Sequence, residues 1–198
     1  MLVSHNHKFF TIDIPKTGTR TFRACLATKA QHRDGFRECE ELSFAGKYNS
    51  CKYKQHSNLT AAIYDLKIDG YDPDTYFSFS FVRNPWARLV SLMLYHNRHF
   101  KKNQSLEFYI DNQPPQFYWL YSKDYKKTVD YIAKFENYKE ELLKFFDRFN
   151  INLDSNKIPH LNENKKYDYK DYYTKELIDK VYEKDYKAIE LMGYTYDG

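Results

Sequence analysis

Residues 7–22, HKFFTIDIPKTGTRTF, decide the fold that we expect for this chain. The first half, His7–Ile14, is rich in aromatic and β-branched residues, which predicts a buried strand that ends at Pro15. The second half predicts a helix over 20–29, because Thr19 can cap its start and apolar residues recur along one face. The order of strand, tight loop and helix is typical of an α/β protein.

A second strand and helix follow at residues 76–94. The segment Tyr76–Val82, YFSFSFV, alternates aromatic residues with serine and predicts the clearest strand of the chain. Asn84 and Pro85 then supply an N-cap and a first helical residue. We also expect a strand over 129–135 and helices over 57–67 (capped by Ser57), 106–110, 137–149 (opened by an Asn137–Glu140 capping box) and 175–191 (ending near Gly193). This alternation predicts one α/β domain over 1–198 whose mainly parallel central sheet is flanked by helices.

The composition limits the class of protein. The chain of 198 residues is 42% hydrophobic and 19% aromatic, enough to form a core without a metal or a disulfide. Its three cysteines lack the spacing of a zinc site, so we expect no structural metal. The net charge of +4 suits a small anionic ligand but falls short of the basic stripe of a nucleic-acid-binding protein. No stretch resembles a membrane span or a signal peptide, so we expect a cytoplasmic protein.

The loop 15–21, PKTGTRT, has the residue types of a phosphate site. Backbone N–H groups at the start of a helix point outward, and the helix dipole there favours an anion. Gly18 allows the backbone to close around a phosphate, and Lys16 adds a mobile cation. The hydroxyl donors of the loop are Thr17, Thr19 and Thr21. The spacing is not that of the Walker A motif, and a turn that only caps a helix is the alternative reading of the loop alone.

Arg83 and Ser91 form a second candidate anion site. Arg83 ends the second strand, and in a parallel sheet the carboxyl ends of neighbouring strands meet at one edge. Ser91 follows two turns into the next helix, so a guanidinium fork and a hydroxyl could together hold one further phosphate. Taken alone, the arginine also suits an ion pair at a helix end, and the serine suits a surface position.

These motifs resemble those of one enzyme family. The segment 14–22, IPKTGTRTF, resembles the 5′-phosphosulfate loop of sulfotransferases that use 3′-phosphoadenosine 5′-phosphosulfate (PAPS). The segment 81–96, FVRNPWARLVSLMLYH, resembles their 3′-phosphate motif. The resemblance is to the branch with carbohydrate sulfotransferases such as the heparan 2-O and chondroitin enzymes, and it covers most of the chain outside 31–52. It implies a P-loop-like sulfotransferase fold and transfer of a sulfuryl group from PAPS to an acceptor hydroxyl.

The resemblance also implies roles for individual cofactor-site residues. Lys16 matches the lysine that contacts the bridging oxygen of the phosphosulfate, and Thr17–Thr21 match the loop around the 5′-phosphate. Arg83 and Ser91 match the pair that binds the 3′-phosphate. Arg20 stands where threonine or serine is frequent, which leaves its role open between a phosphate contact and a surface ion pair.

Two histidines match family positions near the reacting centre. His56 falls where the heparan 2-O branch has its histidine base, and an exposed histidine at a helix start is the alternative. His160 resembles a residue of a loop that closes near the cofactor, although structural packing is favoured there. If His56 is not the base, a carboxylate within 31–41 is the next candidate.

The implied chemistry is an in-line displacement without a metal. A base accepts the proton of the acceptor hydroxyl while positive charge stabilises the leaving oxygen, and His56 and Lys16 suit these two roles. The product would be adenosine 3′,5′-bisphosphate (PAP), and the acceptor a saccharide or a small metabolite. The alternatives are a kinase or nucleotide hydrolase of the P-loop type and a non-catalytic module that binds a nucleotide.

Overall fold

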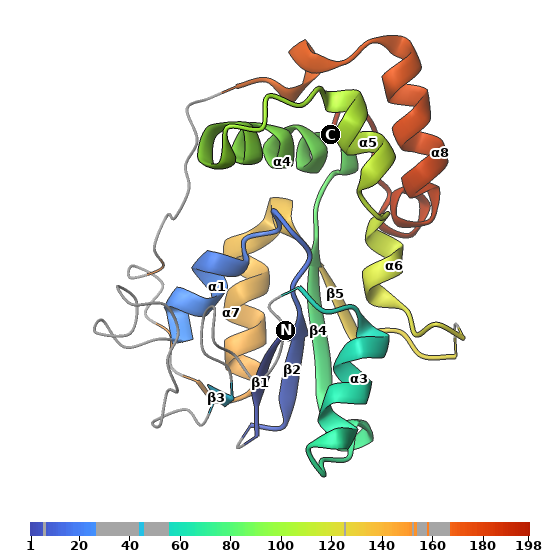
Figure 1. Cartoon of the computed structure of the whole chain (residues 1–198). Coiled ribbons are helices and arrows are strands. Elements are labelled where there is room, and N and C mark those ends of the chain that lie inside the picture. The colour runs from blue at the N-terminus through green and yellow to red at the C-terminus, as the bar shows by residue number, and fades with distance from the viewer. Residues whose placement is uncertain are drawn as a thin grey trace.

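Figure 1 shows the computed structural model, which describes residues 1–5, 7–26, 44–45, 56–124, 126–151, 153, 158 and 167–198. Within these ranges the sheet has the strand order β3-β1-β2-β4-β5. The strands are β1 (Leu2–Ser4), β2 (Phe9–Ile12), β3 (Phe44–Ala45), β4 (Phe77–Val82) and β5 (Tyr131–Lys134). The helices are α1 (Thr19–Leu26), α3 (Leu59–Ile68), α4 (Pro85–Phe100), α5 (Leu106–Asn112), α6 (Gln116–Leu120), α7 (Tyr138–Arg148) and α8 (Lys175–Met192), with 3-10 turns η1 (Pro73–Thr75), η2 (Phe135–Asn137) and η4 (Tyr169–Tyr172).

The centre of the sheet is parallel. Strand β2 pairs with β4, and β4 pairs with β5, both in parallel, while β1 adds antiparallel pairs with β2 and β3 at one edge. The predicted α/β fold with a mainly parallel sheet flanked by helices is confirmed. The sequence did not indicate β1, because its three residues are all buried and too few to show alternation. Since β2 and β4 are neighbours, the two predicted anion motifs follow adjacent strands.

Helices cover both faces of the sheet (Figure 1). Helices α1 and α7 pack on one face, where Phe9 and Phe79 from the strands meet Phe22 and Phe146 from the helices. The other face carries Phe10 and Ile12 and packs against a larger apolar cluster that includes α3 residues. Alternate strand residues therefore enter opposite cores, as the period of two requires.

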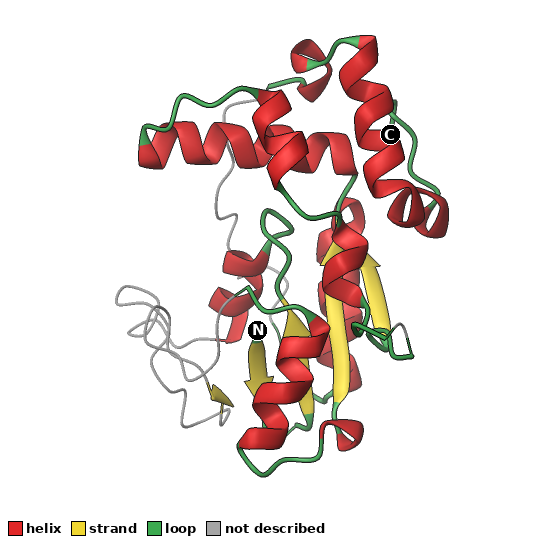
Figure 2. Cartoon of the chain, turned by 45° about the vertical axis from the view of Figure 1, so that its right-hand side comes forward, coloured by secondary structure: helices red, strands yellow, loops and turns green. Residues whose placement is uncertain are grey.

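A third group of helices lies beyond the carboxyl ends of β2 and β4. Helices α4, α5 and α8 contact one another there, and the turned view in Figure 2 shows them gathered above the sheet. Among the residues in the described ranges, no helix is long and apolar enough to cross a membrane.

Some helix boundaries follow the predicted caps and others do not. Thr19 is the first residue of α1 and not its predicted N-cap. The Asn84 side chain accepts a hydrogen bond from the Ala87 N–H at 3.1 Å, as predicted for the start of α4. Helix α3 is capped by Asn58 and not by Ser57, because the Asn58 Oδ1 accepts from the Ala61 N–H at 2.9 Å. The predicted capping box before α7 is wrong: Asn137 makes no such bond, since the 3-10 turn η2 leads directly into the helix.

Candidate functional site

The loop after β2 has an uncommon backbone conformation. Lys16 has φ 72° and Gly18 has φ 84°, both in the left-handed region that residues with a side chain adopt rarely. A Cβ atom at Gly18 would overlap the ring of Tyr138, whose hydroxyl donates to the Gly18 carbonyl at 2.8 Å. The Phe22 N–H donates to the same carbonyl at 3.1 Å as α1 begins. Glycine is therefore required here by its φ and by the approach of Tyr138, which the sequence did not reveal.

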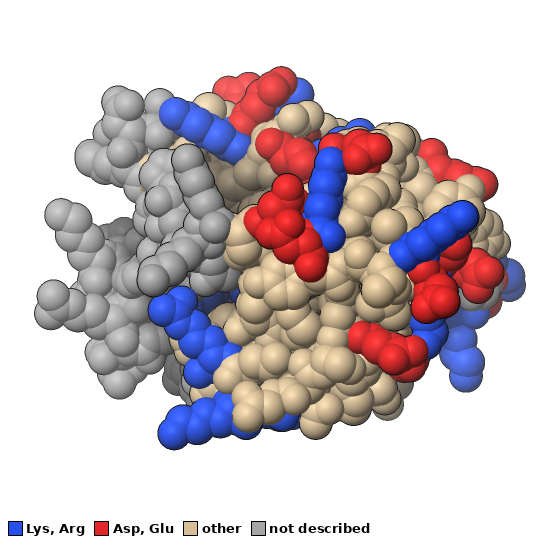
Figure 3. Space-filling model, turned by 90° about the horizontal axis from the view of Figure 1, so that it is seen from above, with Lys and Arg blue, Asp and Glu red and all other residues tan. Residues whose placement is uncertain are grey.

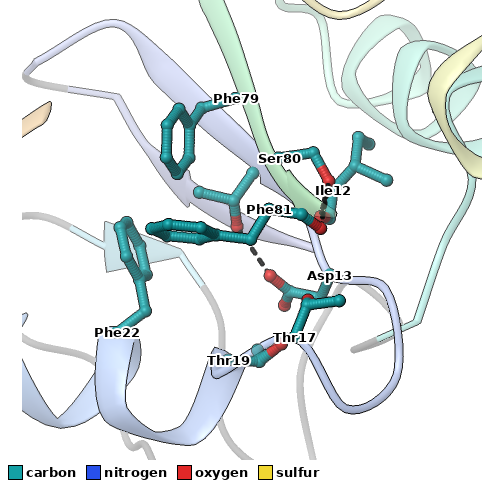
Figure 4. Close-up of a pocket in the computed structure, with 9 residues that line it drawn as sticks. Ile12, Asp13, Thr17, Thr19, Phe22, Phe79, Ser80 and Phe81 are labelled. Carbon is teal, nitrogen blue, oxygen red and sulfur yellow. Dashed lines mark hydrogen bonds between the residues drawn. The ribbon is translucent and has the colours of Figure 1, made fainter. Parts of the chain in front are cut away.

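The threonines of the loop line a small hollow. Thr17 is buried, and its hydroxyl donates to the Ile14 carbonyl at 2.9 Å, so its backbone N–H is the donor that remains for a ligand. Thr17 and Thr19 border a small hollow that is partly open to solvent. Figure 4 shows their side chains near the Asp13 carboxylate, with phenylalanine rings on the opposite wall. Thr21, within α1, is buried.

Asp13 introduces a buried carboxylate beside this hollow. Its side chain accepts from the Thr11 hydroxyl at 2.9 Å and forms an ion pair with the buried Arg23. Burial raises the pKa of Asp13, but the Arg23 guanidinium together with other nearby positive charge holds it below its ordinary value. The pair therefore brings no net negative charge to the wall of an anion site. An aspartate within an apolar strand, followed ten residues later by an arginine, was the available sequence signal.

Lys16 lies against helix α4. Its Nζ atom is 4.2 Å from the centroid of the Tyr95 ring. Burial, followed by the positive charges of Arg83 and Arg20, lowers the pKa of Lys16 to about 8. The ammonium group is thus poorly compensated, and a bound anion would stabilise it.

Arg83, from the second anion motif, contacts the loop of Lys16, the first anion motif. Its Nη1 donates to the Lys16 carbonyl at 3.4 Å, and its guanidinium lies 4.8 Å from the centroid of the Phe135 ring. Ser91 is buried on α4, and within the described ranges its hydroxyl has no hydrogen-bond partner. Tyr95 follows Ser91 by one helical turn, so the serine and the tyrosine that contacts Lys16 share one face of α4. The structure therefore brings Lys16, Arg83 and this face of α4 together at the carboxyl edge of the sheet.

His56 lies at the same edge. Its Nδ1 is 2.7 Å from the Asp13 carbonyl oxygen, which can only accept, so Nδ1 carries the proton and Nε2 is left as the basic atom. The residue is exposed, and the bonded side of its ring faces the protein. Partial burial lowers the pKa of His56, although the hydrogen bond and charge of Asp13 oppose this effect. A neutral imidazole is therefore favoured at neutral pH.

Three further predictions have different outcomes. Arg20 is exposed at the start of α1, and its charge contributes to the lowered pKa of Lys16. His160 and the carboxylates of 31–41 lie outside the described residues. Within the part of the chain that is described, no group of three or more His, Cys, Asp or Glu residues could hold a metal ion.

The surface seen from above carries both charges. In Figure 3, Lys and Arg side chains extend on the side next to the grey residues, while acidic and basic side chains mix over the rest of this view. The described part of this face therefore has no continuous basic stripe.

Comparisons with known proteins agree with this geometry. The family model described as "Sulfotransferase family" matches residues 1–136. An uncharacterized protein of Archaeoglobus fulgidus is 34% identical over 89 residues, which cover 39% of this chain and 71% of that protein. The crystal structure of mouse sulfotransferase SULT7A1 complexed with PAP is similar in fold, with a TM-score of 0.52 and 14% identity over 97% of this chain and 90% of that one. The matched region includes both strands and both anion motifs, and the chain belongs to the sulfotransferase family.

Proposed function

We propose that this protein transfers a sulfuryl group from PAPS to an acceptor hydroxyl and releases PAP. One observation carries the proposal: the Arg83 Nη1 donates to the Lys16 carbonyl at 3.4 Å, so the two anion motifs adjoin at the ends of β2 and β4. A nucleotide with phosphates at both its 5′ and 3′ positions needs two such sites side by side. The similar fold of a sulfotransferase complexed with PAP supports this reading.

The residues at this edge fit the two phosphate groups of such a ligand. Backbone N–H groups at the start of α1 and the Thr17 N–H suit the 5′-phosphate. The Arg83 guanidinium and the Ser91 hydroxyl, which has no partner within the described ranges, suit the 3′-phosphate. Thr19 and Thr21 add hydroxyls near the start of α1, and Arg20 adds a positive charge at the exposed side of that helix start.

Two residues would carry the chemical step. PAPS supplies an activated sulfuryl group, and the acceptor oxygen forms a bond to sulfur as the bond from sulfur to the bridging oxygen breaks. The Nε2 of His56 accepts the acceptor proton, which requires the neutral imidazole that its lowered pKa favours. Lys16 stabilises the negative charge on the leaving oxygen, a contribution of roughly 3 to 4 kcal/mol for a well-placed donor. Lys16 and Arg83 supply the positive charge, so the proposed step needs no metal.

The acceptor is proposed as a saccharide or a small metabolite with a free hydroxyl. The saccharide is favoured by the resemblance of the two motifs to carbohydrate sulfotransferases. The competing functions are a kinase or nucleotide hydrolase and a non-catalytic nucleotide-binding module. They predict a different order of nucleotide affinities.

Calorimetry against PAP, ATP and a short oligonucleotide tests the proposal. We expect PAP to bind in the low micromolar range or tighter without metal, and ATP and the oligonucleotide to bind far more weakly. Arg83→Ala should weaken PAP binding, whereas Arg98→Ala, at an exposed arginine near the end of α4, should not. A ligand at about 100 times its dissociation constant stabilises a protein by roughly 2.7 kcal/mol, so an unchanged melting temperature in millimolar PAP would contradict the proposal.

A further inference from the structure

The backbone of Arg83 is held by one buried amide. Gln116, the first residue of α6, is completely buried. Its Oε1 accepts from the Arg83 N–H at 3.0 Å, and its Nε2 donates to the Arg83 carbonyl at 2.8 Å. A single side chain thus satisfies both backbone groups of the residue that follows β4.

Gln116 is itself fixed by the C-terminal helix. Its backbone N–H donates to the Asp185 Oδ1 at 2.6 Å, and the Asp185 Oδ2 lies 3.6 Å from the Arg88 Nη2. Asp185 is buried at a kink in α8, where its φ of −104° and ψ of 15° are not helical. The kink brings a carboxylate from α8 to the amino end of α6.

The residue after Arg83 depends on the same C-terminal region. The Asn84 N–H donates to the Glu136 Oε1 at 2.8 Å, and the Glu136 Oε2 accepts from the Tyr194 hydroxyl at 2.8 Å. The Asn84 Nδ2 donates to the Thr195 carbonyl at 2.9 Å. Tyr194 and Thr195 lie beyond residues 1–136, the part that the family model matches.

We propose that Gln116, held by Asp185, is a positioning residue for recognition of the 3′-phosphate, so that α8 completes the nucleotide site through Arg83. The inference rests on the proposed role of Arg83 as the ligand of that phosphate. An arginine side chain loses much rotational freedom when it is ordered by a ligand. With its backbone fixed by Gln116 and its guanidinium against Phe135, Arg83 is ordered before the ligand arrives. Preorganisation of this kind raises affinity for the group that the guanidinium contacts and not for the rest of the nucleotide.

The test compares PAP with adenosine 5′-monophosphate (AMP), which lacks the 3′-phosphate. Gln116→Met keeps the size of the side chain and removes both hydrogen bonds to Arg83. We expect it to lower the ratio of PAP affinity to AMP affinity by about tenfold, while AMP affinity stays within about twofold of the wild type. Gln113→Met, three residues earlier and less buried, is the matched control and should leave both affinities unchanged.

A double mutant separates positioning from general loss of structure. In an Arg83→Ala background, Gln116→Met should lower the ratio no further, because the residue that it positions is absent. Melting temperatures verify folding, and Gln116→Leu, which also lacks both hydrogen-bonding groups and carries no charge, replaces Gln116→Met if that variant does not fold.

Two outcomes would overturn the inference in distinguishable ways. In the first outcome, Arg83→Ala lowers the ratio of PAP affinity to AMP affinity, but the Gln116 variants weaken PAP and AMP binding equally or weaken neither. Gln116 then has only a structural role. If Arg83→Ala leaves the ratio unchanged, the assignment of Arg83 to the 3′-phosphate is wrong, and the role of Gln116 is lost with it.

Discussion

The loop 15–18 and the turn 83–85 end neighbouring parallel strands, yet they are held in different ways. At the turn, Gln116 and Glu136 bind the backbone, so the position of Arg83 is set by hydrogen bonds from other elements. In the loop, Lys16 and Gly18 have positive φ. Lys16 contacts the ring of Tyr95, and burial together with neighbouring positive charges lowers its pKa. The binding residue is thus preorganised by hydrogen bonds, whereas the residue proposed for chemistry is tuned by burial and charge.

The largest effect that would separate the two regions is on turnover. Lys16→Met should reduce turnover by about 10² to 10³, because the leaving oxygen loses its cation, while PAP affinity falls by no more than about tenfold. Steady-state rates with labelled PAPS and calorimetry with PAP measure the two quantities. Lys8→Met is the matched control, since Lys8 also has positive φ and its Nζ lies 4.8 Å from the Tyr76 ring centroid. Equal losses of turnover and affinity would show that Lys16 is only a phosphate clamp.

A second comparison concerns the strain of the loop. Gly18→Ala should lower the free energy of unfolding by about 2 to 4 kcal/mol, because the new Cβ meets both an unfavourable φ and the Tyr138 ring. Gly70→Ala has a similar φ of 80° but nothing within 4 Å, so it should cost only about 1 kcal/mol. Urea denaturation measures both. Similar losses for the two variants would mean that the approach of Tyr138 contributes nothing.

The pH dependence tests whether Lys16 is tuned as described. Since Lys16 titrates near pH 8 in the free protein, kcat/KM for PAPS should fall by about tenfold per unit above that pH, as the cation is lost. On the acid side, kcat/KM should decrease only below pH 6.5, the ordinary pKa of a histidine, because the pKa of His56 is lowered.

Stability provides an independent check of the lowered Lys16 pKa. Between about pH 8 and pH 10 the unfolded chain keeps the Lys16 proton that the folded chain has lost, so wild-type stability should rise with pH relative to Lys16→Met. The difference in urea midpoints between the two proteins across this range measures the effect. A constant difference would contradict a lowered pKa.

The smallest effect belongs to Ser91. Ser91→Ala should weaken PAP binding by about fivefold, the cost of roughly one hydrogen bond from an uncharged hydroxyl, and leave stability nearly unchanged. Ser105→Ala provides the opposite pattern, because its hydroxyl caps α5 at 3.2 Å from the Phe108 N–H, and its loss should reduce stability by about 1 kcal/mol without affecting PAP. If Ser91→Ala lowered stability but not PAP affinity, Ser91 would have no role in binding PAP.

The sequence could predict those features that depend on local pattern. Strand β2 follows from its aromatic and β-branched composition, and β4, the Asn84 cap and the helix that carries Ser91 follow from alternation, capping and periodicity along a few residues. The contacts that hold the site join residues far apart in the sequence, and no local pattern predicts them. Tyr138 packs on Gly18 from 120 positions away, and Gln116 binds Asp185 from 69 positions away. Short buried strands such as β1 were missed because alternation needs length.

The parallel pairing of β2 with β4 makes assembly of the site a non-local event in folding. The Ser80 hydroxyl on β4 donates to the Ile12 carbonyl on β2, and these residues are 68 positions apart. Closing a chain segment of this length costs conformational entropy before native contacts form, which slows folding. The loop of Lys16 and the turn of Arg83 meet only when this pairing is complete. A fragment with either motif alone would hold one anion site, and tight binding of a doubly phosphorylated nucleotide would report that the central sheet has formed.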